Sequence, residues 1–267
     1  MSNYYHLSVN VISRSSGRSA VACSAYRSGQ LLRDERYGMT HDYSPRKGIS
    51  DCGVVTPANA PDWTQDRETL WNTLESYERR KDAQLAREFI VGLPHQLTPE
   101  QRKELVEAFI EKELISKGVV ADWAIHAPNR KGDERNFHAH IMATMRTVGA
   151  EGFEEKKDRS LNSRDQLKNW RTSWAGIQNE MFERLDLRDS DGKILTVEHR
   201  SFEAIGLDQE PTVHLGVHAT AMERKGIQTE LGDLNREIAI RNRDRGIRSY
   251  SNAKHQLDND LSLDNSL

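Results

Sequence analysis

The sequence predicts an α+β fold in which helices cover an antiparallel sheet. Two observations favour this class. Segments rich in β-branched and aromatic residues alternate with amphipathic helical segments, and a polar loop joins two of the strand-like segments as a hairpin. The chain has 267 residues, which fits one large domain or one domain with an appendage. We expect one domain over residues 1–245 and a disordered tail or linker over residues 246–267.

The first half of the chain gives these elements in order. "NYYHLSVNVI" (3–12) predicts a strand, and a run of small residues predicts a helix from about 15 to 29. Turn-forming residues over 34–66 predict a long irregular excursion. "DRETLWNTLESYERRKDAQLAREF" follows as a helix, and "EFIVGLP" as a short strand that Pro94 stops.

The second half begins with a helix whose ends are marked. Thr98 is the expected N-cap, Pro99 takes the first helical position, Gln101 completes a capping box, and Gly118 closes the far end. Beyond it we expect two strands joined by a polar loop and then an amphipathic helix, over residues 119–126, 137–146 and 163–186.

The composition excludes several classes of protein. The chain is 30% charged with a mean hydropathy of -0.77, and it has no apolar stretch of the roughly 20 residues that a membrane span needs. The N-terminus lacks the pattern of a signal peptide. Two cysteines, Cys23 and Cys52, form no framework and indicate a reduced cytosolic setting.

The charge is unevenly distributed. The net charge is -3, which argues against non-specific coating of duplex DNA, yet residues 1–50 hold seven Lys/Arg and three Asp/Glu, a local +4. A local basic surface on a near-neutral body suits selective binding of a short nucleic-acid segment. It also occurs in proteins that bind none, so charge alone does not decide the function.

Three histidines carry the strongest chemical signal. Side chains alternate faces along a strand, so His138 and His140 share one face of the second hairpin strand. On the first strand Trp123 points to the core and His126 points away from it. The patterned register of the hairpin therefore predicts that the three imidazoles converge.

Imidazoles bind divalent transition metals, and three protein ligands leave positions open for water or substrate. An open site of this kind acts as a Lewis acid on a carbonyl or phosphoryl oxygen. Ala139, between two of the ligands, is small enough to be buried without crowding them. The alternatives are ordinary hydrogen-bonded histidines, or a structural metal whose fourth ligand the sequence does not reveal.

Tyr26 stands in a segment, "SRSSGRSAVACSAYRSGQ", that offers little packing bulk. A tyrosine on a helix lined by alanine and serine can reach into a cleft, and phenols attack phosphorus or carbonyl centres as nucleophiles. Arg14, Arg18 and Arg27 nearby can pair with backbone phosphates. The alternative is a partly buried tyrosine that serves packing only.

At this point the sequence resembles the MobA/MobL-type (MobQ class) relaxases of mobilisable plasmids, within the HUH endonucleases. The resemblance runs from about residue 3 to 240, and its motifs occur in the family's order. They are "YHLSV", "SGRSAVACSAYRSG", "RKDAQLARE…LP", "NFHAHIMATMR", "LKNWRTSWAGIQNEM", "HRSFEAIGLDQEPTVHLG" and "ERKGIQTELGDLNREI".

The resemblance implies a fold and a reaction. The fold is a central antiparallel sheet of about five strands flanked by helices. Tyr26 corresponds to the nucleophile that attacks one phosphodiester of single-stranded transfer-origin DNA, leaving a 5′-phosphotyrosine link and a free 3′-hydroxyl. His126, His138 and His140 correspond to the metal ligands, for Mg²⁺ or Mn²⁺, with Zn²⁺, Ni²⁺ or Co²⁺ as in vitro alternatives. Glu88 corresponds to an acidic residue that orients a histidine or the tyrosine, or else forms a plain salt bridge.

The resemblance also implies partners and a location. The DNA strand would be held by basic side chains, for which we name Arg14, Arg18, Arg27, Arg87 and Arg146. Splayed bases would stack on aromatic rings, for which the candidates are Tyr4, Tyr5, Tyr43 and Trp63. Relaxosome accessory proteins and a type IV secretion coupling protein are the implied protein partners. The implied location is the bacterial cytoplasm, with transfer into the recipient cell alongside the DNA.

Two other functions compete with this one. A metal-dependent phosphodiesterase or nuclease would use a metal-bound water and form no covalent adduct. A rolling-circle replication initiator uses the same chemistry, but its tyrosine motif normally follows the H-x-H pair, whereas Tyr26 precedes His138 here. The chain contains no G-x-x-x-x-G-K-[ST], so it carries no Walker-type helicase motor.

Overall fold

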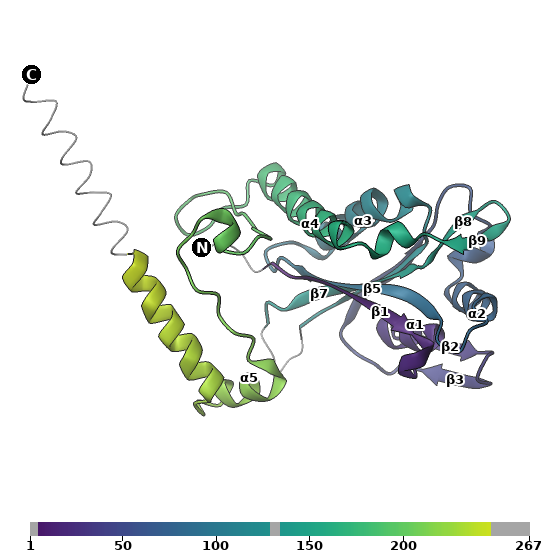
Figure 1. Cartoon of the computed structure of the whole chain (residues 1–267), viewed down its shortest axis with the longest axis horizontal. Coiled ribbons are helices and arrows are strands. Elements are labelled where there is room, and N and C mark those ends of the chain that lie inside the picture. The colour runs from purple at the N-terminus through teal and green to yellow at the C-terminus, as the bar shows by residue number, and fades with distance from the viewer. Residues whose placement is uncertain (1–4, 129–133, 247–267) are drawn as a thin grey trace, which may run out of the picture. The chain divides into compact units, whose positions relative to one another are not determined.

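A five-stranded antiparallel sheet forms the centre of the protein in a computed structural model of the chain (Figure 1). The structure describes residues 5–128 and 134–246. The strands follow the order β1-β5-β7-β6-β4. Their bounds are β1 Leu7–Ser13, β4 Ile49–Val55, β5 Gln84–Leu93, β6 Ala121–His126 and β7 Phe137–Thr144. The predicted α+β class and the sheet of about five strands are confirmed.

Helices cover both faces of this sheet. In Figure 1, α3 and α4 lie together over one face, and α1 and α2 lie together against the other. Two small hairpins, β2–β3 and β8–β9, stand apart from the central sheet. The bounds are α1 Ala20–Ser28, β2 Leu31–Asp34, β3 Met39–Asp42, α2 Arg67–Tyr77, α3 Pro99–Glu113, β8 Arg146–Gly149, β9 Gly152–Lys157, α4 Arg164–Arg184 and α5 Gly216–Arg224. Short 3₁₀ turns lie at Arg14–Ser16, Asp62–Gln65, Ile115–Lys117, Arg159–Asn162 and Glu203–Ile205.

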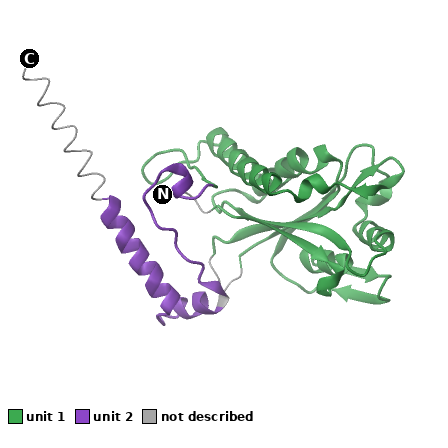
Figure 2. Ribbon diagram, in the orientation of Figure 1, with its two compact units in different colours: residues 1–199 green, residues 200–267 purple. Residues whose placement is uncertain are grey.

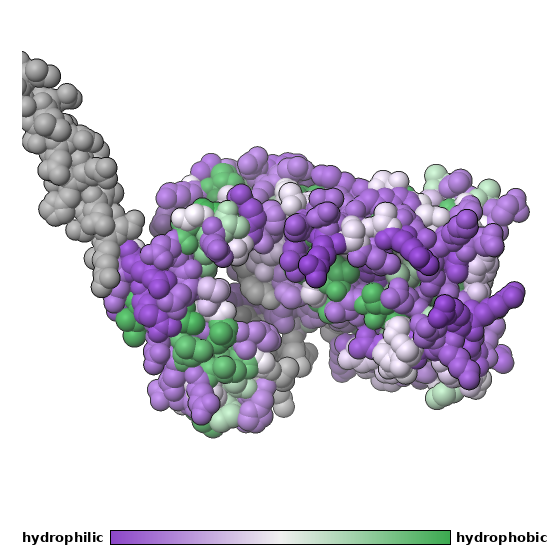
Figure 3. All heavy atoms as spheres, in the orientation of Figure 1, coloured by the Kyte–Doolittle hydropathy of each residue, from purple (hydrophilic) through white to green (hydrophobic). Residues whose placement is uncertain are grey.

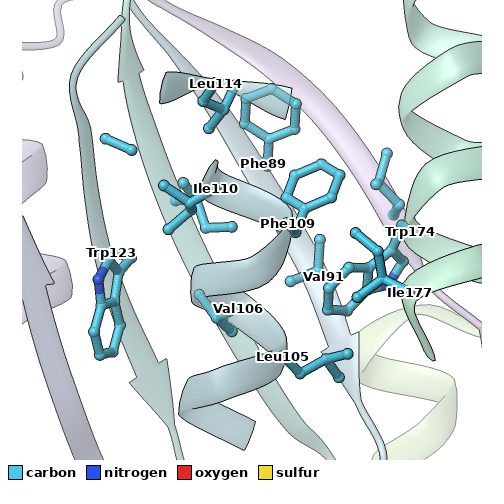
Figure 4. Packing of buried hydrophobic residues seen from close by; sticks show 14 of the residues in the cluster. Phe89, Val91, Leu105, Val106, Phe109, Ile110, Leu114, Trp123, Trp174 and Ile177 are labelled. Carbon is cyan, nitrogen blue, oxygen red and sulfur yellow. The ribbon is translucent and has the colours of Figure 1, made fainter. Parts of the chain in front are cut away.

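The larger core lies between the sheet and the pair α3 and α4 (Figure 4). Aromatic rings meet edge to face there: the Phe89 centroid lies 5.9 Å from that of Phe109 and 4.8 Å from that of Trp170, and Phe109 lies 5.4 Å from Trp174. Such pairs stabilise a core beyond the area that they bury. This core packs against one face of the sheet. The opposite face is therefore free to carry polar side chains.

The second core lies between the sheet and the pair α1 and α2. The small side chains of Ala20 and Ala25 are fully buried and let the α1 backbone approach the sheet closely, and the bulk comes from Leu70 and Trp71 of α2. The lack of bulky residues in this helix therefore matches its position close to the sheet.

The predicted boundaries of α3 are confirmed at its start. Thr98 caps the helix in a capping box with Gln101, and Pro99 is the first helical residue. At the other end α3 stops at Glu113, and Gly118, with a φ of 74°, closes the following 3₁₀ turn. α4 begins after Ser163, whose side chain accepts from the backbone N–H of Gln166.

Three predicted boundaries were wrong. Residues 34–66 include β4, an edge strand of the central sheet that pairs with β6. The helix expected to continue to Phe89 ends at Tyr77, and residues from Gln84 onward form β5 between β1 and β7. The first helix begins at Ala20 rather than near residue 15, because Gly17 interrupts the chain with a φ of 71° and Ser19 caps the helix.

The chain divides into two compact units, residues 1–199 and residues 200–267 (Figure 2). Unit 1 holds the sheet and both cores. Unit 2 holds α5 and a helical segment over 230–246. The guanidinium of Arg236, in that segment, lies 2.8 Å from the carboxylate of Glu223 in α5. In Figure 3 hydrophilic side chains predominate on the visible face of unit 1, and apolar side chains are visible on unit 2. Among the described residues of unit 2, five large apolar side chains are exposed: Leu207, Ile227, Leu231, Leu234 and Ile240.

Two expectations concern the extent of the tail and of the domain. The tail expected to be disordered, residues 246–267, lies outside them from residue 247 onward. The single domain expected over residues 1–245 stays a prediction. Among the helices of the described residues, none combines the length and the apolar character that crossing a membrane requires.

Candidate metal and nucleophile site

Three histidines lie at one end of the β6–β7 hairpin, on one face of the sheet. The register places His126 opposite His138, with His140 two residues farther along β7. Trp123 of β6 packs in the core on the other face, as the alternation of side chains requires. The His126 ring centroid lies 5.3 Å from that of His138 and 4.9 Å from that of His140, and one ring nitrogen of each lies within 4.8 Å of the others. The predicted convergence is confirmed.

Hydrogen bonds fix which nitrogen of each ring can bind a metal. Each imidazole donates one N–H to a protein oxygen: His126 Nε2 to the Arg27 carbonyl (2.8 Å), His138 Nδ1 to the Asn136 carbonyl (3.1 Å) and His140 Nδ1 to Glu88 Oε1 (2.9 Å). Because these oxygens only accept, the donating nitrogens carry the protons. The lone pairs left for a metal are those of His126 Nδ1, His138 Nε2 and His140 Nε2.

Burial keeps two of the rings neutral. It lowers the pKa of His126 to about 4, with the charges of His140, His138 and Arg46 acting in the same direction against the hydrogen bond to the backbone. Burial, together with His140 and Arg46, also lowers the pKa of His138. Neutral imidazole is the form that binds a metal. At neutral pH both rings are therefore ready to act as ligands.

Glu88 is a buried carboxylate on β5 that joins the histidines to α1. Its Oε1 accepts from His140 Nδ1 at 2.9 Å and from Arg27 Nε at 2.5 Å. Burial raises the pKa of Glu88, but the hydrogen bonds and charges of His140 and Arg27 outweigh it and the net pKa is lowered. Glu88 is thus ionised, and it orients both a histidine ring and an arginine.

The end of α1 contacts the histidines through Arg27. Its backbone carbonyl accepts from His126 Nε2, and its guanidinium pairs with Glu88. Gly29, with a φ of 65°, ends the helix two residues later and turns the chain away. One residue of the helix is therefore connected to two of the three histidines.

Tyr26 precedes Arg27 and has a side chain that is 46% exposed. The guanidinium carbon of Arg46 lies 3.7 Å from the centroid of its ring, and Arg46 Nη1 donates to its backbone carbonyl. The edge of the Tyr43 ring completes the surroundings, with centroids 5.2 Å apart. The phenol is thus accessible to a macromolecular substrate while its ring is held on two sides.

Buried carboxylates hold α1 in place. Four of them accept from its residues: Asp34 from Ser19, Glu75 from the backbone N–H of Ala20, Asp122 from Ser24 and Glu88 from Arg27. Asp122, on the histidine face of β6, also accepts from Arg67 Nε at 2.9 Å and from Trp71 Nε1 at 2.8 Å. Hydrogen bonds with charged acceptors are stronger than neutral ones, so they fix a helix whose small side chains pack with little area.

Two of the arginines named for DNA binding are occupied inside the protein. Arg14 is buried and donates to Glu75 Oε2 at 2.5 Å and to three backbone carbonyls. Arg27 pairs with Glu88 and donates to a backbone carbonyl of its own helix. Because Arg14 is buried against Glu75 and backbone carbonyls and Arg27 is held by Glu88, we remove both from the proposed DNA contacts and assign them to positioning.

The other three arginines differ from one another. Arg87 is buried on the face of the sheet opposite the histidines, beside Asn162, and burial lowers its pKa to about 10. Arg146 donates to Glu78 at 2.7 Å and to backbone carbonyls of β9. Arg18 is exposed, just before α1. Of the five, Arg18 is the one that we keep as a proposed DNA contact.

The candidate stacking residues also divide. Tyr4 lies outside the described residues. Tyr5 packs against the larger core and donates to a backbone carbonyl of α4 at 3.0 Å, and Trp63 packs against the second core. Tyr43 lies beside Tyr26 and is the one of the described candidates that adjoins the site.

Two residues of the site were missed in the sequence. Arg46, in "DYSPRKG", lies in a loop that was interpreted as irregular, and the only signal was a basic pair after a proline. Asp122 stands in strand alternation with His126, so the pattern that predicted the histidine face also placed a carboxylate on it. Its partners on α1 and α2 come from segments that no local pattern connects.

The three histidines fit a divalent transition-metal ion. Each offers one nitrogen lone pair, and the other nitrogen is fixed by an oxygen acceptor, as in protein metal sites generally. Imidazole suits ions such as Zn²⁺, Ni²⁺ and Fe²⁺, whereas Mg²⁺ prefers oxygen ligands. The donor set thus favours a transition metal over Mg²⁺, and the identity of the ion stays a prediction.

Known proteins are similar in sequence to this chain over most of its length. The model of the "MobA/MobL family" matches residues 18–225 of this chain, a span that includes Tyr26 and all three histidines. The chain belongs to the MobA/MobL family. Two relatives of this MobA/MobL protein are named for conjugal transfer and for mobilization. It is 36% identical to "Conjugal transfer protein TraA" of Agrobacterium fabrum over 262 residues, which are 87% of this chain and 23% of TraA. It is 34% identical to "Mobilization protein MobL" of Acidithiobacillus ferridurans, with 83% of this chain and 64% of MobL covered.

A solved structure shares the fold of this MobA/MobL protein. It is described as "Molecular Basis of Vancomycin Resistance Transfer in Staphylococcus aureus" and is 32% identical, with a TM-score of 0.65. The likeness covers 74% of this chain and 98% of that one. The chain thus spans nearly all of this solved structure but less than a quarter of the TraA relative.

Proposed function

We propose that this MobA/MobL protein is a relaxase that cleaves one strand of single-stranded transfer-origin DNA, with Tyr26 as the nucleophile. The observation that carries the proposal is the double connection of Arg27, which joins the helix of Tyr26 to His126 and, through Glu88, to His140. Membership of the MobA/MobL family and relatives named for conjugal transfer and mobilization support it.

The reaction is a transesterification. The phenolic oxygen of Tyr26 attacks the phosphorus of one phosphodiester, so a new P–O bond forms and the bond from phosphorus to the 3′ oxygen breaks. The phenol loses one proton and the departing 3′ oxygen gains one. The products are a 5′-phosphotyrosine link and a free 3′-hydroxyl. Because one phosphodiester replaces another, the reaction can run backwards and rejoin the ends.

The residues of the site divide the work. His126, His138 and His140 would hold a divalent metal, which when bound stabilises negative charge on a phosphate oxygen. Glu88 orients the ring of His140, and Arg27 keeps the end of α1 against the histidines. The exposure of Tyr26 allows a DNA strand to reach its hydroxyl.

The proposed relaxase unit corresponds to part of its longer relatives. Because the chain spans 23% of TraA, the activity and the partners of a longer protein are proposals here. The accessory proteins of a relaxosome and a secretion coupling protein remain proposed partners. Exposed Arg18, just before the start of α1, is the proposed contact for the DNA backbone.

A covalent-capture experiment tests this function. A pool of single-stranded oligonucleotides with randomised sequence, labelled at the 3′ end, is incubated with protein and Mn²⁺ and resolved on a denaturing gel. The 3′ label is needed because the fragment with the 5′ phosphate stays on the protein. We expect a labelled adduct with the wild type and none with Tyr26→Phe.

The matched control is Tyr37→Phe, since Tyr37 is exposed to a similar extent. It should form the adduct as the wild type does. Cleavage by Tyr26→Phe without any adduct would contradict the proposal and indicate a phosphodiesterase that uses a metal-bound water. Sequencing the captured strands would also identify the preferred cleavage site.

A further inference from the structure

We propose that Arg46 is a further catalytic residue, which holds the ring of Tyr26 and binds the phosphate that Tyr26 attacks. The proposal rests on the proposed role of Tyr26 as nucleophile. It assigns a role to a residue in the loop between β3 and β4, outside the motifs that identify the tyrosine and the histidines.

The loop that carries Arg46 connects the two halves of the site. The backbone N–H of Tyr43 donates to the carbonyl of Gln30, just beyond the end of α1, at 3.2 Å. At the other end of the loop, the N–H of Ala127 donates to the carbonyl of Gly48 at 2.7 Å, just after the last residue of β6. The loop is therefore tied both to the helix of Tyr26 and to the strand of His126.

Arg46 contacts Tyr26 in two ways. Its guanidinium carbon lies 3.7 Å from the centroid of the ring, the geometry of a cation–π contact, and its Nη1 donates to the backbone carbonyl of the same residue. The edge of Tyr43 packs on the ring as well. These contacts restrict the rotation of the ring and place a positive charge beside the phenol.

Arg46 has unused N–H donors that can bind a phosphate. A guanidinium carries five N–H donors, and within the described part of the chain Arg46 uses one of them, at Nη1. Arg27 and Arg14, by contrast, are occupied by buried carboxylates. A planar guanidinium with free donors binds a phosphate by two parallel hydrogen bonds.

The loop of Arg46 also adjoins the strand of His126, because the N–H of Ala127 donates to the carbonyl of Gly48 at 2.7 Å. A phosphate that lies against both Tyr26 and the histidines would therefore also lie within the field of this guanidinium. No bond to Arg46 forms or breaks in the reaction: it offsets the negative charge that grows on the phosphate as the phenol attacks.

The first test measures how fast the covalent adduct forms under single-turnover conditions, with a strand captured from the randomised pool. We expect Arg46→Gln to slow the reaction by roughly 100-fold, the loss typical of removing one such donor. Arg46→Lys keeps the charge without the planar fork, so its rate of adduct formation should lie between those of the wild type and Arg46→Gln. Lys47→Gln is the matched control, because it removes the same charge from an exposed neighbour in the same loop, and it should react at the wild-type rate.

The second test measures phosphate binding without chemistry, in the Tyr26→Phe background. The captured strand is compared with one that carries an uncharged methylphosphonate at the cleaved linkage. We expect the methylphosphonate to weaken binding by about tenfold when Arg46 is present and to have little effect in the Arg46→Gln protein, because a hydrogen bond to a charged group is then already lost. Equal sensitivity in both proteins would overturn the proposal.

Two controls separate the possible outcomes. Arg46→Gln should bind Mn²⁺ with wild-type affinity and unfold cooperatively on heating. If it does not fold, the rate of adduct formation by Arg46→Lys is the test, and a wild-type rate for that variant overturns the role of Arg46. A wild-type rate for Arg46→Gln, with an intact wild-type adduct, overturns the role of Arg46 alone. If the wild type forms no adduct with any strand, the proposed function fails and the role of Arg46 fails with it.

Discussion

His126 donates a hydrogen bond of 2.8 Å to the backbone carbonyl of Arg27. This bond joins the strand of a metal-ligand candidate to the helix of the proposed nucleophile. Because a backbone carbonyl has a fixed position relative to its helix, this bond ties the position of the His126 ring to that of the α1 backbone. The arrangement of the site thus depends on how firmly α1 is held, and the side chain of the same arginine provides one of the restraints.

Breaking the pair of Arg27 and Glu88 should destabilise the protein. Arg27→Met leaves the Glu88 carboxylate buried without its cation, and removing one partner of a buried pair typically costs about 3 kcal/mol or more. Urea unfolding of metal-free protein measures the loss. Arg80→Met, which breaks the exposed pair of Arg80 and Asp82, is the control and should leave the free energy of unfolding unchanged. Equal losses in both variants would contradict this role for burial.

Removing the charge of Glu88 should weaken metal binding. Glu88→Gln keeps an acceptor for His140 but takes away the negative charge that makes the ring a better ligand. Changes to such supporting residues typically reduce metal affinity by roughly 10- to 100-fold. Isothermal titration calorimetry with Mn²⁺ and Zn²⁺ measures it, with the exposed Glu155→Gln as the control. Unchanged affinity would mean that Glu88 serves only the salt bridge.

Local sequence patterns sufficed where the relevant geometry is local. Strand alternation in "VVADWAIH" and "FHAHIMATMR" predicted the face that His126, His138 and His140 share, because a hairpin pairs neighbouring segments and its register follows from the apolar pattern. The capping box of Thr98 and Gln101 likewise lies within one turn of chain. Both predictions needed no distant partner.

The errors occurred where a distant segment decides the structure. "AQLARE" consists of good helix formers, yet from Gln84 it forms β5, because β1 and β7 pair with it on both sides. β4 contains Asp51, Cys52 and Gly53, which give no strand pattern, and pairing with β6 makes it a strand. Arg14 looked like a phosphate contact because the sequence shows its charge but not the buried Glu75 that pairs with it.

The stability of the metal-free protein should fall between pH 6.5 and pH 4. An unfolded chain protonates histidine near pH 6.5, whereas burial lowers the pKa of His126 to about 4 in the folded state. In this window the unfolded state binds more protons, so stability is present above it and is lost as the pH falls through it. The loss from His126 should be on the order of 2 kcal/mol.

Urea unfolding in the presence of a chelator, at several pH values, measures this dependence. His126→Gln retains a donor for the Arg27 carbonyl but cannot titrate, so its pH dependence should be flatter than that of the wild type. His95→Gln is the control, since His95 is exposed, and it should keep the wild-type dependence. The same slope in His126→Gln as in the wild type would show that another group causes the acid sensitivity.

Asp122 should control how firmly α1 is held. Its carboxylate accepts from Ser24 of α1 and from Arg67 and Trp71 at α2, and it lies on the same face of β6 as His126. Asp122→Asn removes the charge that balances buried Arg67 and should cost about 3 kcal/mol of stability. Because the lost contacts converge on α1 and α2, the amides of α1 should exchange hydrogen faster, while those of α3, on the other face of the sheet, keep their protection.

Hydrogen exchange read by mass spectrometry tests this, with exposed Asp82→Asn as the control. Uniformly faster exchange in α1 and α3 would show that Asp122 supports the whole fold rather than the position of the helix that carries Tyr26.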